Sequence, residues 1–180
     1  VILRIASPFT ALGILWLNLL TDGLPAMALA VDPGDPSIMK RKPRGKGGSM
    51  LHEILLFAIV GGILAFIATI LLFAFNYPYN VVDPIAYEMG LNRARTIALT
   101  TSVVFELAVV FVTRAPEGKS VWLHTPVNNK YLLLAVGIAL GLQLFIIYEP
   151  DAANVFDLVP IGWVDWLWII GVVLSCMVVL

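Results

Sequence analysis

The stretch Ile14-Leu-Trp-Leu-Asn-Leu-Leu-Thr-Asp-Gly-Leu-Pro25 decides how this chain is organised, because it places polar groups inside an apolar run long enough to cross a bilayer. Asn18, Thr21 and Asp22 stand at positions i, i+3 and i+4, so their side chains share one face of a helix. Pro25 has no N–H, so the carbonyl of Thr21 loses its helical partner, and the helix is predicted to unwind between Asp22 and Pro25. Hard cations such as Ca²⁺ prefer the oxygen ligands that converge there. The stretch therefore predicts an ion site within the membrane.

The composition indicates an integral membrane protein that would be surrounded by lipid. Hydrophobic residues make up 60% of the chain and charged residues only 13%, and the mean hydropathy is +0.94. Soluble domains carry about 25% charged residues. The single cysteine, Cys176, excludes an internal disulfide framework. We expect no nucleic-acid partner.

Five segments are apolar and long enough to span a bilayer, which takes about 20 residues. They are residues 11–31, 52–75, 95–113, 131–148 and 163–180. The predicted fold is therefore all-α: a polytopic bundle of about five transmembrane helices, the first of them unwound.

The fourth segment carries two features that predict helix packing. Gly137 and Gly141 form a G-x-x-x-G pair, which marks a packing face more often than a dimerisation signal. Gln143 lies beside the pair, and we expect it to form a hydrogen bond across helices.

Basic residues are distributed unevenly between the connections, and this predicts the orientation. The connections 32–51 and 114–130 hold eight: Lys40, Arg41, Lys42, Arg44, Lys46, Arg114, Lys119 and Lys130. The two alternate connections hold only Arg93 and Arg95. Because basic loops stay in the cytoplasm, residues 32–51 and 114–130 are predicted to be cytoplasmic, and the C-terminus with them.

Two acidic residues, Asp22 and Glu106, lie in the middle of predicted spans. A charge at that depth costs about 2.5–3.5 kcal/mol, so such residues usually face the interior of a bundle and have a function. The alternative for each is a protonated acid that is hydrogen-bonded to a neighbouring helix. Their spans enter the membrane from the same side and their depths match, which favours one shared site.

Longer motifs surround these residues. They are Pro8-Phe-Thr-Ala-Leu-Gly-Ile-Leu-Trp-Leu-Asn-Leu-Leu-Thr-Asp-Gly-Leu-Pro-Ala26, the turn Val31-Asp-Pro-Gly-Asp-Pro-Ser-Ile-Met-Lys-Arg-Lys-Pro-Arg44, and Ser102-Val-Val-Phe-Glu106. Together they resemble P-type cation-transporting ATPases, and within that family the calcium pumps of the sarco/endoplasmic-reticulum type and their prokaryotic relatives. The resemblance covers essentially all 180 residues and implies that the five segments correspond to the sixth to tenth spans of such a pump, the C-terminal part of its membrane domain.

The resemblance also implies roles for the polar residues. Asn18, Thr21 and Asp22 correspond to ion ligands of the unwound sixth span, with Asp22 bridging two ion sites. Glu106 corresponds to the carboxylate of the eighth span, and together with Thr21 it favours a two-site arrangement of the calcium type. Gly13 departs from the family, which usually has glutamine at that position.

The resemblance also implies what the rest of the pump supplies. The family's Asp-Lys-Thr-Gly-Thr phosphorylation motif and its nucleotide-binding domain are absent from these residues. We therefore expect neither catalytic nor cofactor-binding residues in this chain, and we expect ATP and Mg²⁺ to act in the full-length protein only. The remaining spans and cytoplasmic domains would be its partners, in the cell membrane of a prokaryote.

The expected function is therefore part of the ion site of an ATP-driven pump that moves Ca²⁺ out of the cytoplasm with proton counter-transport. Two alternatives remain open. One is the same architecture with another cation, such as Na⁺, Mn²⁺ or Mg²⁺. The other is a non-catalytic membrane scaffold.

Overall fold

A computed structural model describes residues 6–31, 50–113 and 129–180, and within these ranges it contains helices and no strand. The elements are α1 (Ala11–Asn18), the π-helix η1 (Leu19–Gly23), α2 (Leu24–Ala30), α3 (Met50–Asn76), α4 (Pro84–Thr113), α5 (Lys130–Tyr148), α6 (Pro150–Phe156) and α7 (Trp163–Val179). The predicted all-α membrane bundle is confirmed. Four helical segments are long and apolar enough to cross a membrane, and α7, with 17 residues, is a shorter apolar helix.

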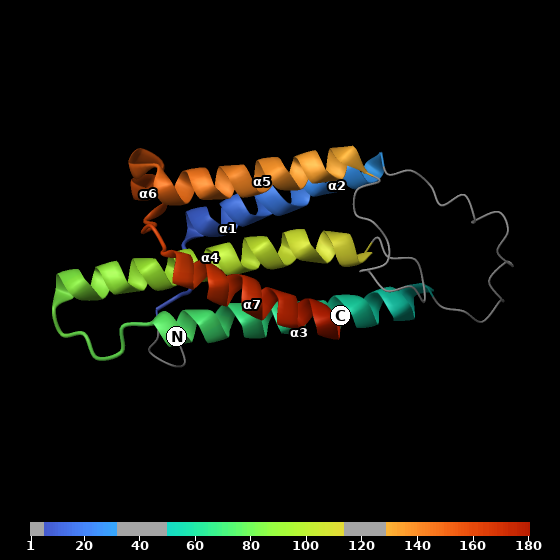
Figure 1. The fold of residues 1–180 in the computed structure, drawn as a ribbon. Coiled ribbons are helices and arrows are strands. Elements are labelled where there is room, and N and C mark those ends of the chain that lie inside the picture. The colour runs from blue at the N-terminus through green and yellow to red at the C-terminus, as the bar shows by residue number, and fades with distance from the viewer. Residues whose placement is uncertain (1–5, 32–49, 114–128) are drawn as a thin grey trace, which may run out of the picture.

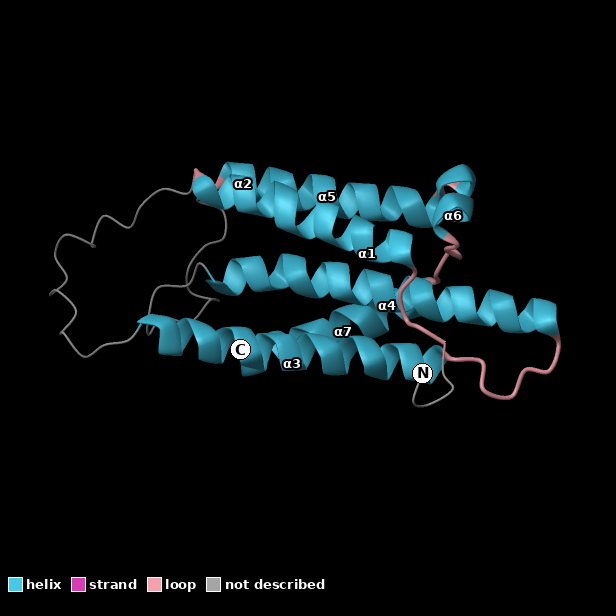
Figure 2. Ribbon diagram, turned by 180° about the vertical axis from the view of Figure 1, so that it is seen from behind, coloured by secondary structure: helices cyan, strands magenta, loops and turns pink. Residues whose placement is uncertain are grey.

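The helices run side by side along one common direction (Figure 1). Seen from either side, α5 lies along the composite helix α1–η1–α2, while α3 and α7 lie on the other side of α4 (Figure 2). The helix α4 therefore occupies the middle of the bundle and contacts both groups. Its side chains Ala98, Val103 and Thr100 are completely buried.

The helix ends follow an up-and-down order. The end of α2, the start of α3, the end of α4 and the start of α5 all lie at one end of the bundle, and α7 runs toward that same end (Figure 1). The strongly basic connections lie mostly outside the described residues, which omit 32–49 and 114–128, so the orientation stays a prediction.

The third predicted span begins earlier than expected. We predicted residues 95–113, but α4 starts at Pro84, so Arg93 and Arg95 lie inside a helix rather than in a connection. The side chain of Asp83 accepts a hydrogen bond from the backbone N–H of Ala86 at 3.1 Å and caps this start. The predicted span began after these charged residues because they interrupt the apolar run, but charged residues do not end a helix.

The predicted disturbance before Pro25 is present, but its form differs from an unwound segment. Residues Leu19–Gly23 form a π-helix, and Gly23 keeps helical dihedral angles with φ −74° and ψ −68°. A π-turn pairs each carbonyl with the fifth residue onward rather than the fourth. The chain thus accommodates the proline by widening one turn, with Pro25 in the first turn of α2, where proline is tolerated.

Among the described residues, the glycine pair of α5 does not form the packing face that we predicted. A Cβ atom placed on Gly137 or Gly141 would meet nothing within 4 Å among the described residues, and both glycines are exposed. The helix instead buries its opposite face, which includes Leu132, Ala139 and Gln143. Close approach occurs at Gly13, where an added Cβ would lie 3.2 Å from the Thr10 hydroxyl and 3.7 Å from Leu99 of α4.

Candidate functional site

The four predicted ligands lie on two neighbouring helical segments. Asn18 is the last residue of α1, and Thr21 and Asp22 lie in the π-helix η1. Glu106 lies on α4, which contacts η1. The widened turn and the middle helix of the bundle therefore share one polar region.

Thr21 is the link between the two segments. Its side chain is buried, and its hydroxyl donates a hydrogen bond of 2.8 Å to the carbonyl oxygen of Leu17. The Thr21 hydroxyl and the Asp22 side chain also lie close to the carboxyl group of Glu106. Three of the four predicted residues are thus brought together.

Asn18 and Asp22 are exposed, whereas Glu106 is half-buried. In the described part of the chain, Asn18 is not among the groups that interact with Glu106. The polar region is therefore closed on the side of α4 and open on the other side of η1.

The open side belongs to a continuous exposed face of the first helix. Leu15 and Leu19 are 64% and 67% exposed, and Met27 is 72% exposed. Asn18 and Asp22 interrupt this apolar face. Because a carboxylate at this depth is costly in contact with lipid, the face is suited to protein neighbours or to a polar cavity.

The described residues supply an incomplete cation shell. They contain no group of three or more His, Cys, Asp or Glu side chains that could hold a metal ion. Two carboxylates, one hydroxyl and one amide would offer fewer oxygens than the six to eight that Ca²⁺ takes unless each carboxylate bound through both oxygens. The arrangement can bind part of a hard cation and leaves room for ligands from elsewhere.

Gln143 lies next to this region and bridges three helices. Its side-chain oxygen accepts a hydrogen bond from the indole of Trp16 at 2.9 Å, and its side-chain nitrogen donates to the hydroxyl of Thr100 at 3.2 Å. Trp16 lies on α1 and Thr100 on α4. The predicted hydrogen bond across helices is confirmed, with a partner on each side.

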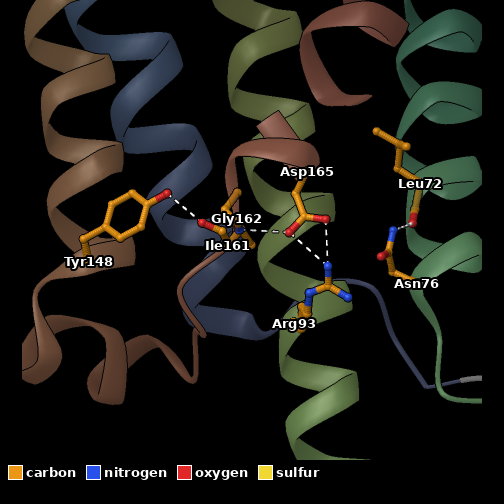
Figure 3. A network of polar contacts seen from close by, with 7 residues as sticks. All are labelled: Leu72, Asn76, Arg93, Tyr148, Ile161, Gly162 and Asp165. Carbon is orange, nitrogen blue, oxygen red and sulfur yellow. Dashed lines mark hydrogen bonds and ion pairs between the residues drawn. The ribbon is translucent and has the colours of Figure 1, made fainter. Parts of the chain in front are cut away.

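A second polar contact was not predicted. Nη2 of Arg93 donates to both carboxylate oxygens of Asp165, at 2.8 and 3.0 Å, and Asp165 also accepts from the backbone N–H of Gly162 at 3.0 Å (Figure 3). The pair joins α4 to the first turn of α7. Asp165 itself fits a known sequence signal, because acidic residues are enriched in the first turn of a helix. Its arginine partner lies 72 residues away, so the sequence around Asp165 does not indicate which residue it pairs with.

The fold and the polar region define a class: a multi-pass helical membrane protein with one carboxylate in its first apolar span and one in α4. The chain belongs to the P-type cation-transporting ATPases, since the family model described as "Cation transporting ATPase, C-terminus" matches residues 6–180.

Similar proteins point the same way. The chain is 39% identical over 171 residues to a calcium-transporting ATPase of Bacillus subtilis, an alignment that covers 94% of this chain and 18% of that protein. It is 32% identical over 174 residues to calcium-transporting ATPase 1 of Bacillus cereus, covering 92% and 20%. With calcium-transporting ATPase type 2C member 1 of Mus musculus it shares 30% identity over 180 residues, covering 99% and 18%. The chain thus spans about a fifth of the length of these relatives.

Proposed function

We propose that this chain is the C-terminal part of the membrane domain of an ATP-driven pump that moves Ca²⁺ out of the cytoplasm. In this proposal Asn18, Thr21, Asp22 and Glu106 each contribute an oxygen ligand to the transported ion. The observation that carries it is the meeting of Thr21 and Asp22, in a π-helical turn, with Glu106 on α4. The relatives named as calcium-transporting ATPases support the choice of ion.

The π-turn is what makes the first helix suited to this role. In a regular α-helix every backbone carbonyl in the middle of a span is occupied by a hydrogen bond. Pro25 has no N–H to donate to the turn before it, so one backbone carbonyl oxygen close to Thr21 and Asp22 loses a donor and would be available to an ion. π-turns inside α-helices occur frequently at functional sites.

Ligands from outside this chain would complete the shell. The side chains of Asn18 and Asp22 are exposed, and with one oxygen from each side chain the four proposed ligands supply fewer than the six to eight oxygens that Ca²⁺ takes. Further spans of the same pump, packed on the exposed face that includes Leu15, Leu19 and Met27, would bring them. ATP and Mg²⁺ would act in domains that likewise lie outside these residues.

The two carboxylates also suggest how charge is balanced during transport. Two neighbouring carboxylates cannot both stay ionised in a dry site once the cation has left, because like charges there disfavour the ionised form. We therefore propose that protons replace Ca²⁺ on Asp22 and Glu106 and are carried in the opposite direction. A pump that alternates between two states, one with tight and one with weak ion binding, would then exchange the two.

Two substitutions in the full-length pump test this proposal. Asp22→Asn should abolish Ca²⁺-dependent ATP hydrolysis, since in this proposal Asp22, in the π-turn, serves ions on either side. Glu106→Gln should weaken the apparent Ca²⁺ affinity roughly ten- to a hundredfold and leave activity at high Ca²⁺, because one charge-assisted contact of about 1.5–3 kcal/mol is lost.

Both variants must first insert into the membrane and fold, which intrinsic thermal stability in detergent would establish. Unchanged Ca²⁺ affinity of the Asp22→Asn pump would contradict the proposed ligand set. Activation of the unmodified pump by Na⁺, Mn²⁺ or Mg²⁺ in the absence of Ca²⁺ would assign the site to another cation instead.

A further inference from the structure

The helix α5 carries none of the proposed ligands, yet it holds both helical segments that do. At its start, the Asn129 side chain donates a hydrogen bond of 3.0 Å to the carbonyl oxygen of Ala28 on α2. Farther along, Gln143 contacts Trp16 of α1 and Thr100 of α4. The second contact is the one that joins the two sides of the ion site.

The chemistry of these partners fixes the orientation of the Gln143 amide. An indole N–H can only donate, so Trp16 requires the oxygen of the amide. The nitrogen then faces Thr100, whose hydroxyl can accept. Gln143 and Thr100 are fully buried. A single planar group thus spans α1 and α4 in one defined geometry.

The bridge is close to the proposed site along both helices. Trp16 precedes Asn18 by two residues, and Thr100 precedes Glu106 by six, which at 1.5 Å per residue is about 9 Å along the α4 axis. The Trp16 ring is itself held in place, with its centroid 5.2 Å from that of Phe156 in an edge-on contact. A change at Gln143 would therefore alter the spacing between Asp22 and Glu106 without removing any ligand.

We propose that Gln143 is a positioning residue for ion binding, which sets the separation of the helices that carry Asp22 and Glu106. This inference rests on the ion site proposed above. It predicts that loss of the bridge changes the apparent ion affinity more than the maximal rate, because the ligands and the rest of the pump remain intact.

The test is Ca²⁺-dependent ATP hydrolysis of the full-length pump with Gln143→Met, which keeps an unbranched side chain of similar length but no amide. The apparent KM for Ca²⁺ should rise about three- to tenfold, the factor that a typical hydrogen bond between membrane helices would give if its loss weakened only the ion-bound state. The maximal rate should change less than about twofold on the same argument.

Trp16→Phe is the milder variant, since it removes the indole N–H and keeps an aromatic ring. It should raise KM in the same direction, and Trp16→Phe combined with Gln143→Met should have no larger effect than Gln143→Met alone, because Gln143→Met already removes the hydrogen bond that Trp16→Phe removes. Independent, additive effects of the two substitutions would overturn the proposal.

Thr69→Val is the matched control. The Thr69 hydroxyl forms a buried hydrogen bond of 3.0 Å with Ser102, which joins α3 to α4 and does not touch the first helix. This variant should lower the thermal midpoint, because it removes a buried hydrogen bond between helices, and leave KM for Ca²⁺ unchanged. Equal KM values for the two variants would overturn the positioning role. If Asp22→Asn abolished Ca²⁺-dependent activity in the same assay, the ion site would still stand.

Discussion

The helices α3 and α4 follow one another along the chain, and their surroundings differ sharply. The more hydrophobic of the two is α3, yet only 11% of its most apolar 18-residue stretch is buried within the bundle. For α4 the buried share of the corresponding stretch is 56%. In water the more hydrophobic helix would be expected at the centre. In a bilayer, lipid is as apolar as leucine, so hydrophobicity does not select which helix is enclosed by protein. Small and polar side chains do, and α4 buries Ala94, Ala98 and Thr101 completely.

The largest expected effect tests the close packing of α4. Ala98 is completely buried beside Phe73 of α3, so Ala98→Phe would force the two helices apart. We expect a loss of at least about 3 kcal/mol of stability, at the upper end for overpacked cores. The measurement is the thermal midpoint of the full-length protein in detergent, together with its size-exclusion profile.

The same substitution on α3 provides the control. Ala58 is exposed, so Ala58→Phe should change the midpoint little. A loss as large as that of Ala98→Phe would break the comparison, because it would mean that a span outside this chain covers α3 and that α3 is not a lipid-facing helix.

A middle-sized effect is expected where α4 is tied to α7. Arg93→Leu would leave the buried carboxylate of Asp165 with the Gly162 N–H as its remaining described partner. We expect about 1–2 kcal/mol of destabilisation, since the Arg93 side chain is itself 48% exposed and partly screened. Adding Asp165→Asn should recover most of the loss, because it removes the unpaired charge.

Arg95→Leu is the matched control for this pair. Arg95 donates to the carbonyl oxygen of Ser7 at 3.2 Å in an exposed position, so its loss should be close to neutral. If both arginine variants were equally destabilising, the contact between Arg93 and Asp165 would stabilise the protein no more than the exposed contact of Arg95 does.

The smallest effect concerns the polar bond between the compared helices. Thr69→Val removes the hydroxyl that pairs with Ser102 and should cost about 0.6 kcal/mol, the average for hydrogen bonds between membrane helices. A double-mutant cycle with Ser102→Ala should assign the whole loss to this pair. A cost above that of Ala98→Phe would show that polar bonds, rather than close packing, keep α3 against α4.

Much of the fold and of the candidate site was predictable from the sequence. Long apolar runs predicted the helices, because a backbone in lipid must satisfy its own hydrogen bonds. Pro25 predicted a disturbed turn, because its missing N–H acts within four residues. Asp22 and Glu106 stood out as costly charges at membrane depth, and the structure brings them near one another.

Tertiary structure alone decided which surfaces meet. The π-helical form of the disturbed turn, the partners of Gln143, and the contact of Arg93 with Asp165 all depend on residues far apart in the chain. The exposed pair Gly137 and Gly141 shows the same limit, since a small-residue face can pack only if the bundle turns it toward a neighbour. Local sequence specifies helices because their hydrogen bonds are local. Which face each helix buries depends on the shapes of its neighbours, because lipid solvates every apolar face almost equally well.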